Sequence, residues 1–390
     1  MSQQPISLSP DLQRLREDGY DISIEAGYLV LKDLPYVNSQ RQVRRGALVA
    51  KLDLNGDITR QPDDHVAYFA GEEPCDRNGT PLLHIIGRTT QTFGERLKVN
   101  YQFSSKPPGG KYPDYYEKMT TYVALIQNQA QAIDPTVSAK TFRVVEAEEE
   151  SVFNYEDTAS SRANIAAITG KLRAHKLAII GMGGTGSYVL DLVAKTPAPA
   201  IHVYDGDRFG QHNAFRSPGA PSITTLQAVT NKAEYFQQLY APMRKHITAH
   251  PYYVDETNVA ELREVDFVFL CIDRNSARKM IAEQLEAFGV PFIDVGMGIP
   301  RAEECLGGIV RVTTSTPQKR SHLAACVSLA DAPDDDEYNR NIQIADLNAL
   351  NAALAVIKWK KLCGFYRDTR HEHHLTYTIS GNMIVNEEES

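Results

Sequence analysis

The first third of the chain alternates short apolar and polar runs. Stretches such as YDISIEAGYLVL (20–31), ALVAKLDLNGDI (47–58) and KVNYQF (98–103) place many apolar side chains at every second position. Alternation with a period of two is typical of strands with one buried face. Asn55-Gly56 is a common hairpin turn. Residues 1–140 are therefore predicted to form an α+β domain built on a largely antiparallel sheet.

A helix is predicted near the end of this domain. After the loop KPPGGKYP (106–113), apolar residues recur at helical spacing over 114–133, and Asp114 stands where an N-cap is expected. The polar segment 141–165 offers no face to bury, so it is predicted to be a linker and N-terminal arm. His65 and Asp64 are a weak site candidate, because a histidine entering a strand beside a surface turn is more often structural.

From residue 171 the pattern changes to continuous apolar runs separated by segments of helix length. The strand-like runs are KLAIIG, AIHVYD, DFVFLCID and VPFIDVG, and the helix-length segments are 186–195, 222–240 and 275–288. This order predicts an α/β fold, a Rossmann-like doubly wound sheet covered on both faces, over residues 166–390. A last helix is predicted near 340–364 with one apolar stripe, and a hairpin around 380–382. The stripe consists of Leu347, Leu350, Leu354 and Ile357.

Composition and charge exclude several classes of protein. The chain has 390 residues, which suits two domains. Its net charge of −8 does not suit a surface that binds phosphate backbones, so no nucleic-acid partner is expected. No apolar run reaches the ~20 residues of a membrane span, and the first residues lack a signal-peptide pattern. We expect a cytoplasmic protein with reduced thiols and no membrane partner.

A glycine-rich turn follows the first strand of the second domain. GMGGTG places Gly181, Gly183, Gly184 and Gly186 between a buried strand and a helix, where main-chain N–H groups meet phosphates. Asp205 ends the next strand, the usual position of a carboxylate that binds ribose. By themselves these features fit a ligand-free turn, an NAD-dependent dehydrogenase or an ATP site.

Further polar residues lie where strands reach the same edge of the predicted sheet. The cationic side chains of Arg216 and Lys232 can neutralise a polyphosphate, and the carboxylate of Asp273 at a strand end can hold Mg²⁺. A dehydrogenase does not require such a set, so chemistry at a phosphate is favoured. These residues are Asp207, Asn213, Arg216, Lys232, Asp273 and Arg278.

In order and spacing, these residues resemble the ThiF/MoeB adenylyltransferase family, whose fold is shared by ubiquitin-activating enzymes. The likeness covers residues 160–310, with a looser match to about 363. It implies ATP and Mg²⁺ as cofactors, with Asp205 on the ribose and Asp273 as the metal ligand. The phosphates would be held by Asn213, Arg216 and Lys232, with Arg278 completing the nucleotide-binding set. Arg162 would reach the triphosphate of a partner in a homodimer, unless it is a solvated residue at a helix start.

The resemblance also implies the substrate. Family members adenylate the C-terminal carboxylate of a small carrier, here expected to be a ubiquitin-like protein ending in glycine. Many then transfer the acyl group to a cysteine in a crossover loop. Here the polar segment 313–340 corresponds to that loop, and Cys326 is its only thiol. Cys326 as a packed apolar residue remains the alternative, as do Ser321 or Ser328 as acceptors. Cys305 is a second candidate expected to be packed in the core, and Cys271 is expected to be core.

Three other functions remain open. One is an adenylyltransferase of the same fold acting on a sulfur carrier or a nucleoside of tRNA, without a covalent enzyme step. Another is an NAD-dependent oxidoreductase that uses only the glycine turn and Asp205. The third is a catalytically silent scaffold. By elimination the N-terminal domain is expected to bind the carrier or a downstream conjugating protein.

Overall fold

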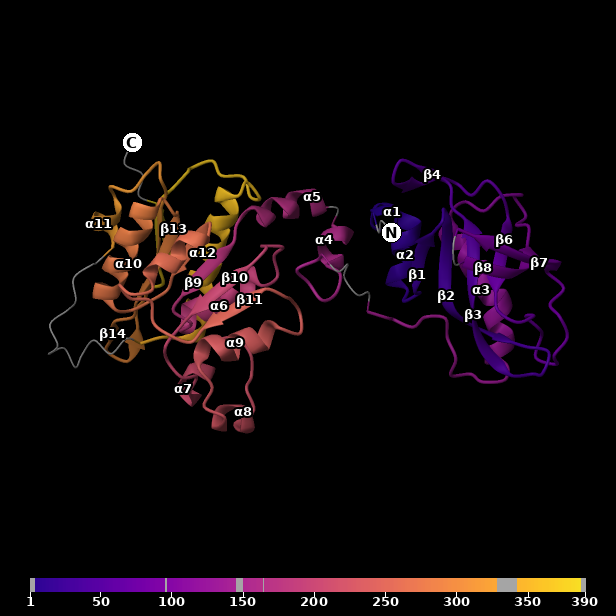
Figure 1. The fold of residues 1–390 in the computed structure, drawn as a ribbon, viewed down its shortest axis with the longest axis horizontal. Coiled ribbons are helices and arrows are strands. Elements are labelled where there is room, and N and C mark those ends of the chain that lie inside the picture. Colours follow the sequence, from indigo (N-terminus) through magenta and orange to yellow (C-terminus); the bar gives the residue numbers. More distant parts are fainter. Residues whose placement is uncertain (1–3, 95–96, 145–149, 164, 328–341, 387–390) are drawn as a thin grey trace. The chain divides into compact units, whose positions relative to one another are not determined.

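The protein is described here from a computed structural model, which describes residues 4–94, 97–144, 150–163, 165–327 and 342–386. The chain divides into two compact units (Figure 1). The N-terminal unit comprises residues 1–145 and 157–165, and the C-terminal unit comprises residues 146–156 and 166–390. The boundaries between the two units therefore fall within residues 141–166, at the predicted linker.

The N-terminal unit is built on a six-stranded antiparallel sheet of order β1-β2-β3-β6-β8-β7. Its helices and one face of the sheet share a core that includes Leu31, Phe69 and Tyr122. The other face carries a smaller cluster around Val49 and Val99. The elements are α1 Gln4–Leu8, α2 Pro10–Glu17, β1 Ile22–Glu25, β2 Tyr28–Val37, β3 Val43–Lys51, β4 Leu54–Asn55, β5 Ile58–Thr59, β6 Val66–Ala70, β7 Ile85–Phe93, β8 Leu97–Ser104, α3 Tyr115–Gln131 and α4 Thr158–Arg162.

The predicted antiparallel sheet and the helix of this unit are confirmed. Asp114 caps α3 by accepting a hydrogen bond of 2.8 Å from the main-chain N–H of Glu117. The hairpin predicted at Asn55-Gly56 is present as β4 and β5, but its turn lies one residue later, at Gly56-Asp57, because Asn55 pairs with Ile58. Helices α1 and α2 were not predicted, because they are short: α1 has five residues, and the buried leucines of α2, Leu12 and Leu15, lie within a single turn.

The C-terminal unit is built on an eight-stranded sheet of order β11-β10-β9-β12-β13-β16-β17-β18. The first five strands in this order are parallel and the last three antiparallel, which confirms the predicted Rossmann-like fold class. The strands are β9 Leu177–Ile180, β10 Ile201–Tyr204, β11 Ile247–His250, β12 Phe267–Leu270, β13 Phe292–Gly298, β14 Arg301–Ala302, β15 Cys305–Leu306, β16 Ile309–Ser315, β17 His374–Thr378 and β18 Met383–Asn386.

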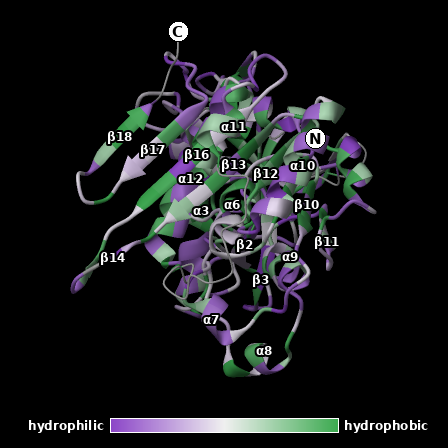
Figure 2. Cartoon of the chain, turned by 90° about the vertical axis from the view of Figure 1, so that its left-hand side faces the viewer, coloured by the Kyte–Doolittle hydropathy of each residue, from purple (hydrophilic) through white to green (hydrophobic). Residues whose placement is uncertain are grey.

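Helices cover both faces of this sheet because its central strands are apolar on both sides. Leu177 and Ile179 of β9 face one core, and Ala178 and Ile180 face the other. Strands β9 and β12 consist entirely of buried residues, and Figure 2 colours the central strands mainly as hydrophobic. The helices are α5 Ala166–Thr169, α6 Gly184–Val193, α7 Gln211–Ala214, α8 Ile223–Gln227, α9 Lys232–Tyr240, α10 Asn275–Phe288, α11 Leu323–Cys326 and α12 Ala345–Leu362, with 3₁₀ turns at Gly170–Ala174 and Val259–Glu264.

Three predictions for this unit were wrong in detail. The segment 222–240 is two helices, because the side chain of Asn231 caps a new helix at Lys232. Strand β16 continues to Ser315, so the predicted crossover loop begins with strand residues. The predicted apolar stripe of α12 is only partly buried, since Leu347 is 6% exposed and Leu354 packs against the core, whereas Ile357 is 41% exposed. The buried residues of α12 also include small and amide side chains such as Asn348, Ala352 and Ala355, and Asn348 packs against Gly184 of α6.

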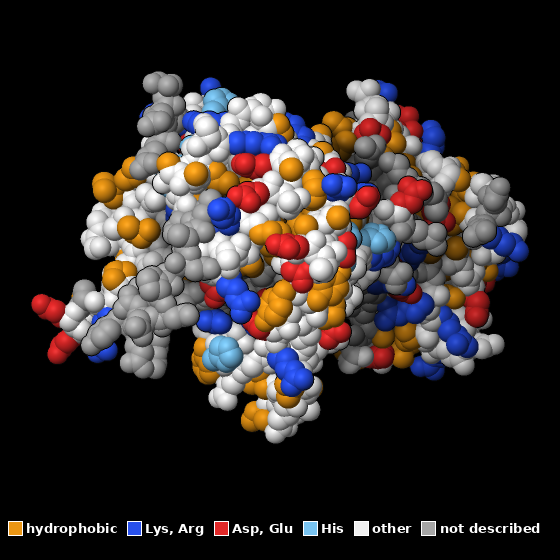
Figure 3. Space-filling model, turned by 60° about the vertical axis from the view of Figure 1, so that its left-hand side comes forward, with side chains coloured by type: hydrophobic (Ala, Val, Ile, Leu, Met, Phe, Trp, Pro, Cys, Tyr) orange, Lys and Arg blue, Asp and Glu red, His pale blue; other side chains and the backbone are white. Residues whose placement is uncertain are grey.

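The surface does not concentrate one sign of charge on the face drawn in Figure 3, where basic and acidic side chains are interspersed. Within the described part of the chain, no helix is both long and apolar enough to cross a membrane.

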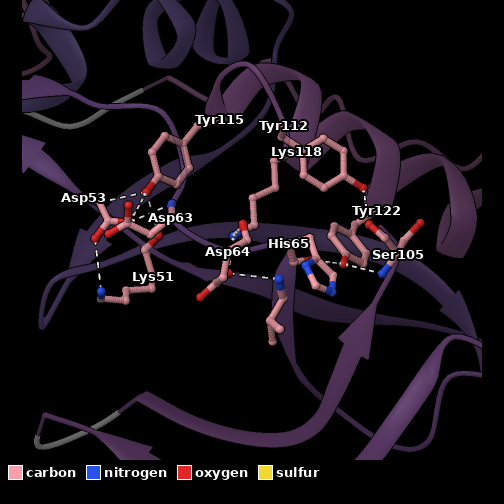
Figure 4. A network of polar contacts seen from close by, with 11 residues as sticks. Lys51, Asp53, Asp63, Asp64, His65, Ser105, Tyr112, Tyr115, Lys118 and Tyr122 are labelled. Atoms are coloured by element: carbon pink, nitrogen blue, oxygen red, sulfur yellow. Dashed lines mark hydrogen bonds and ion pairs between the residues drawn. The ribbon is translucent and has the colours of Figure 1, made fainter. Parts of the chain in front are cut away.

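A polar network fastens α3 to the segment that precedes β6 (Figure 4). Lys118, with 1% of its side chain exposed, lies 3.0 Å from Asp64 Oδ1 and 3.1 Å from the main-chain oxygen of Asp64. Burial lowers the pKa of Lys118. Tyr122 donates a hydrogen bond to the main-chain oxygen of His65. Asp64 and His65, the weak site candidate, thus make the contacts of residues that hold the fold together.

Asp64→Ala is expected to lower the free energy of unfolding of this unit by about 2–3 kcal/mol, because the buried ammonium then keeps one carbonyl partner. Lys118→Met removes the buried charge, and the 45% exposed side chain of Asp64 is then hydrated, so the expected change is below ~1 kcal/mol. Hydrogen exchange of α3 in the full chain, followed by mass spectrometry, measures the change in the free energy of unfolding for both variants. A larger loss for Lys118→Met would contradict this interpretation.

Candidate nucleotide-binding site

A cleft of about 1760 Å³ opens at the carboxyl ends of β9, β10, β12 and β13 in the C-terminal unit. Strands β10 and β12 flank β9 on opposite sides, so the chain leaves the sheet in opposite directions beside this cleft. Such a reversal is where open parallel sheets bind ligands. The cleft is lined by the glycine turn, Asp205, Asp207, Arg216, Lys232, Tyr253, Asp273, Arg278, Arg311 and Asn351, among others.

The glycine turn is shaped by close contacts within the protein. Gly181 has a φ of +91°, and a Cβ atom there would lie 2.5 Å from the main-chain oxygen of Cys271. A Cβ atom at Gly186 would overlap the main-chain oxygen of Gly181. Gly184 begins α6 against the buried side chain of Asn348. Of the four glycines, Gly183 alone has open space around the position of a Cβ atom, so this residue leaves room for a ligand.

Asp205 is held by the turn that it faces. Its Oδ2 accepts a hydrogen bond of 2.7 Å from the N–H of Met182, and its Oδ1 accepts one of 2.8 Å from the N–H of Asp207. The residue is 7% exposed, and burial raises the pKa of its carboxyl group. Each carboxylate oxygen can accept a second hydrogen bond, so the group is oriented but not saturated.

Lys232 brings positive charge to the same edge. It is 6% exposed, and its Nζ lies 2.7 Å from Asp207 Oδ2 and 3.8 Å from Asp205 Oδ1. Its position depends on Asn231, whose Nδ2 donates to the main-chain oxygens of Asp205 (2.8 Å) and Asp207 (3.0 Å). The Oδ1 of the same amide caps α9. One side chain therefore joins the strand end to the start of the helix.

Tyr253 is a member of the site that sequence reasoning missed. It donates a hydrogen bond to Asp207, which raises the pKa of the phenol to about 12. Its ring lies over Gly206, where a Cβ atom would come within 2.7 Å of a ring carbon. The only signal in the sequence is its place after β11, at the same sheet edge.

Asn213 and Arg216 present buried donors without partners. Asn213 is 3% exposed, and its Oδ1 accepts a hydrogen bond of 2.9 Å from Gly210 N–H, while its Nδ2 has no hydrogen-bond partner. Arg216 Nε is also buried without a hydrogen-bond partner. Asn348 connects this loop to the glycine turn, because its amide contacts Thr185 Oγ1 (3.0 Å) and the main-chain oxygen of Arg216 (3.3 Å). Arg216 lines the cleft, where its donor suits an anionic ligand, whereas Asn213 is not among the residues that line the cleft.

Asp273 and Arg278 differ in how freely their side chains can contact a ligand in the cleft. Asp273 is exposed and lines the cleft just before α10. Arg278 is 8% exposed and engaged with the main-chain oxygen of Ile272, with Asn275 and with Asp294. Its assignment to the nucleotide thus stays a prediction, and its contacts are those of a residue that shapes the loop beside Asp273.

The remaining candidates lie elsewhere. Arg162 ends α4 in the N-terminal unit, and its side chain lies outside the described part. Cys326 is half-buried at the end of α11, and Ser328 lies outside the described residues. Cys305 was expected in the core but is exposed, because β15 belongs to a two-stranded hairpin outside the main sheet. Burial raises the pKa of Cys271, as expected of a core thiol.

The chain is similar to known protein families and to solved structures. The chain matches a domain of unknown function (DUF6791) over residues 10–158 and the ThiF family over residues 159–386. None of the curated proteins matches it. Among solved structures, E. coli MccB with ATP is 17% identical at a TM-score of 0.46, and the match covers 59% of this chain and 69% of MccB. Selenomethionine PaaA is 16% identical at a TM-score of 0.47, covering 74% and 92%. Because the family match spans more than half of its length, the chain belongs to the ThiF family.

Proposed function

We propose that the protein uses ATP to adenylate the C-terminal carboxylate of a protein or peptide. The observation that carries this proposal is the pair of buried donors without partners, Asn213 Nδ2 and Arg216 Nε, in a loop tied to the glycine turn. Buried donors without partners are costly, and phosphate oxygens would satisfy them. Membership of the ThiF family supports the same activity.

In the proposed reaction a carboxylate oxygen attacks the α-phosphorus, the bond from that phosphorus to the bridging oxygen breaks, and pyrophosphate leaves. Asp205 accepts hydrogen bonds from the ribose hydroxyls. The open space at Gly183 admits the phosphates beside the N-terminus of α6. Asn213, Arg216 and Lys232 stabilise the charge that builds up on the departing oxygens.

The residues present fit Mg²⁺ only if the ion is shared with the nucleotide. The described residues contain no group of three or more His, Cys, Asp or Glu side chains that would hold a metal by themselves. One or two carboxylates together with substrate phosphates are the usual ligands of Mg²⁺ in ATP sites. Asp273 would hold the ion, which when bound neutralises phosphate charge.

The proposal extends to the substrate and to the next step. The carrier is a ubiquitin-like protein with a C-terminal glycine, and the N-terminal unit binds it or a downstream conjugating protein. In the second step the thiolate of Cys326 attacks the acyl carbon, a thioester forms and AMP leaves. The protein acts as a homodimer in which Arg162 reaches the partner's triphosphate.

Cys326→Ala is expected to keep ATP–pyrophosphate exchange within about twofold and to lose a covalent, reducible adduct with the carrier. The exchange is measured with candidate carriers ending in glycine, and the adduct by intact-mass spectrometry with ATP. Cys305→Ala is the matched control and keeps both.

The outcomes separate the alternatives. An adduct that persists in Cys326→Ala places the nucleophile elsewhere. Exchange without any adduct favours an adenylyltransferase that forms no enzyme thioester. Binding of NAD that survives Arg216→Ala supports an oxidoreductase, and a protein that binds no ATP contradicts the proposal as a whole.

A further inference from the structure

A second cationic group lies in the cleft on the side of β13 and β16. Arg311 of β16 stands opposite Gly296 of β13 in the sheet register. Its guanidinium lies across the neighbouring strand, over Gly296. A Cβ atom at Gly296 would come within 2.6 Å of Arg311 Nη2. That Nη2 lies 2.6 Å from Asp294 Oδ2, and Nη1 donates to Thr313 Oγ1 at 2.7 Å. The absence of a side chain at residue 296 thus makes room for a positioned guanidinium.

The charges around Asp294 do not balance. Asp294 is 1% exposed and contacts two arginines, with Arg278 Nε 3.0 Å from its Oδ1 in an ion pair that lacks hydrogen-bond geometry. Among the ion pairs of the described residues, two guanidinium groups share this one carboxylate, so these three side chains together carry one net positive charge. Burial raises the pKa of Asp294, which can only increase that surplus. A surplus charge in a buried place calls for an anion.

Arg311 is the member of this cluster that can reach a ligand. Its side chain is 16% exposed and lines the cleft. Of its five N–H donors, the contacts to Asp294 and Thr313 use two. The donors that remain suit a carboxylate, which arginine binds through two parallel hydrogen bonds.

An independent feature of α12 points to the same place. Asn351 is fully buried, lines the cleft, and donates from Nδ2 to the main-chain oxygen of Gly296 at 3.0 Å. Its Oδ1 is buried and has no hydrogen-bond partner. This acceptor lies beside the residue over which Arg311 extends, and a peptide N–H would satisfy it.

We propose that Arg311 and Asn351 form the subsite for the last residue of the acyl substrate. Arg311 pairs with the C-terminal carboxylate, and Asn351 Oδ1 accepts the amide N–H of the same residue. The lining beyond them, which includes Met297, Ile299 and Ile309, receives the residues that precede it. This inference rests on the proposed function and assigns residues to its carboxylate substrate.

The smallest probe of this subsite is N-acetylglycine, which carries both the carboxylate and the amide N–H. Saturation-transfer NMR on the full chain compares its binding with that of N-acetylglycinamide. We expect the acid to bind at least tenfold more tightly than the amide, since a charged hydrogen-bonded pair contributes about 1.5–3 kcal/mol. Arg311→Gln leaves Asp294 paired with Arg278 and is expected to abolish the preference. Asn351→Ala is expected to weaken both probes.

Arg301→Gln is the matched control, because Arg301 is an exposed arginine that lines the same cleft, and it keeps the preference. Equal binding of the two probes by the unaltered protein, or a preference that survives Arg311→Gln, overturns the inference. ATP affinity is measured on the same samples without carrier. Failure to bind ATP with the preference intact contradicts the proposed function alone. Normal ATP binding and exchange without the preference contradict this subsite alone.

Discussion

Lys232→Met is expected to slow ATP–pyrophosphate exchange about 1000-fold, which corresponds to ~4 kcal/mol of transition-state stabilisation. The ammonium of Lys232 lies between Asp205 and Asp207 in a buried position. Without it, two carboxylates would face the triphosphate with no cation between them. The loss of exchange rate is therefore expected to be as large as the removal of one charged donor can cause. The contact between Lys232 and the phosphates is missing, and the two carboxylates also repel the triphosphate.

Lys195→Met is the control for this experiment. Lys195 is half-exposed and pairs with Asp191 one helical turn earlier, outside the cleft lining. Such surface pairs contribute little, so exchange within twofold of the unaltered protein is expected. Initial rates of exchange and ATP affinity by calorimetry distinguish the variants. If Lys232→Met retains more than a tenth of the exchange rate, Lys232 does not serve the phosphates.

Gly186→Ala is expected to abolish measurable ATP binding by deforming the glycine turn. The added methyl group would overlap the main-chain oxygen of Gly181, and neither backbone can move without displacing β9 or α6. A lower melting temperature of the C-terminal unit should accompany the loss. Trp359 is the only tryptophan in the sequence and is fully buried in this unit, so its fluorescence reports the unfolding of this part of the chain.

Gly183→Ala is the informative partner of that variant. No atom lies within 4 Å of a Cβ at this position, so the unfolding of the C-terminal unit should change by less than ~1 kcal/mol, the usual effect at an N-cap. The methyl group would project where the phosphates are proposed to lie, so ATP affinity should still fall. Unchanged affinity in Gly183→Ala would mean that the phosphates do not approach this turn.

The residues around the glycine turn were predictable from the sequence because their positions follow from local rules. A buried strand, a glycine turn and a helix fix where Gly181 and Gly183 lie, and parallel strands bring Asp205 and Asp273 to the same edge. Each of these placements depends on strand ends that are visible as apolar runs. The spacing from Asp205 to Asn213 and Arg216 required only a short loop.

The residues that were missed depend on contacts between distant segments. Tyr253 reaches Asp207 from the far end of β11, and Asn351 reaches Gly296 from α12. The error for α12 has the same origin. The spacing of leucine and isoleucine predicted its buried face only in part, because the amides of Asn348 and Asn351 are also buried, against Gly184 and at the main-chain oxygen of Gly296. Periodicity detects apolar volume, and it does not reveal where a helix must approach another closely.

The amide of Asn231 fixes Lys232 relative to the strand end, whatever path the chain takes in between. The intervening helix α8 has no buried residues, and Ile223 on it is 76% exposed. Residues 219–225 can therefore lengthen, shorten or change sequence without displacing the lysine, whereas Leu226 packs against the core and the main-chain oxygen of Thr230 accepts a hydrogen bond from Phe209 N–H. This loop is free to diverge and acquire new recognition roles while the reaction centre stays the same.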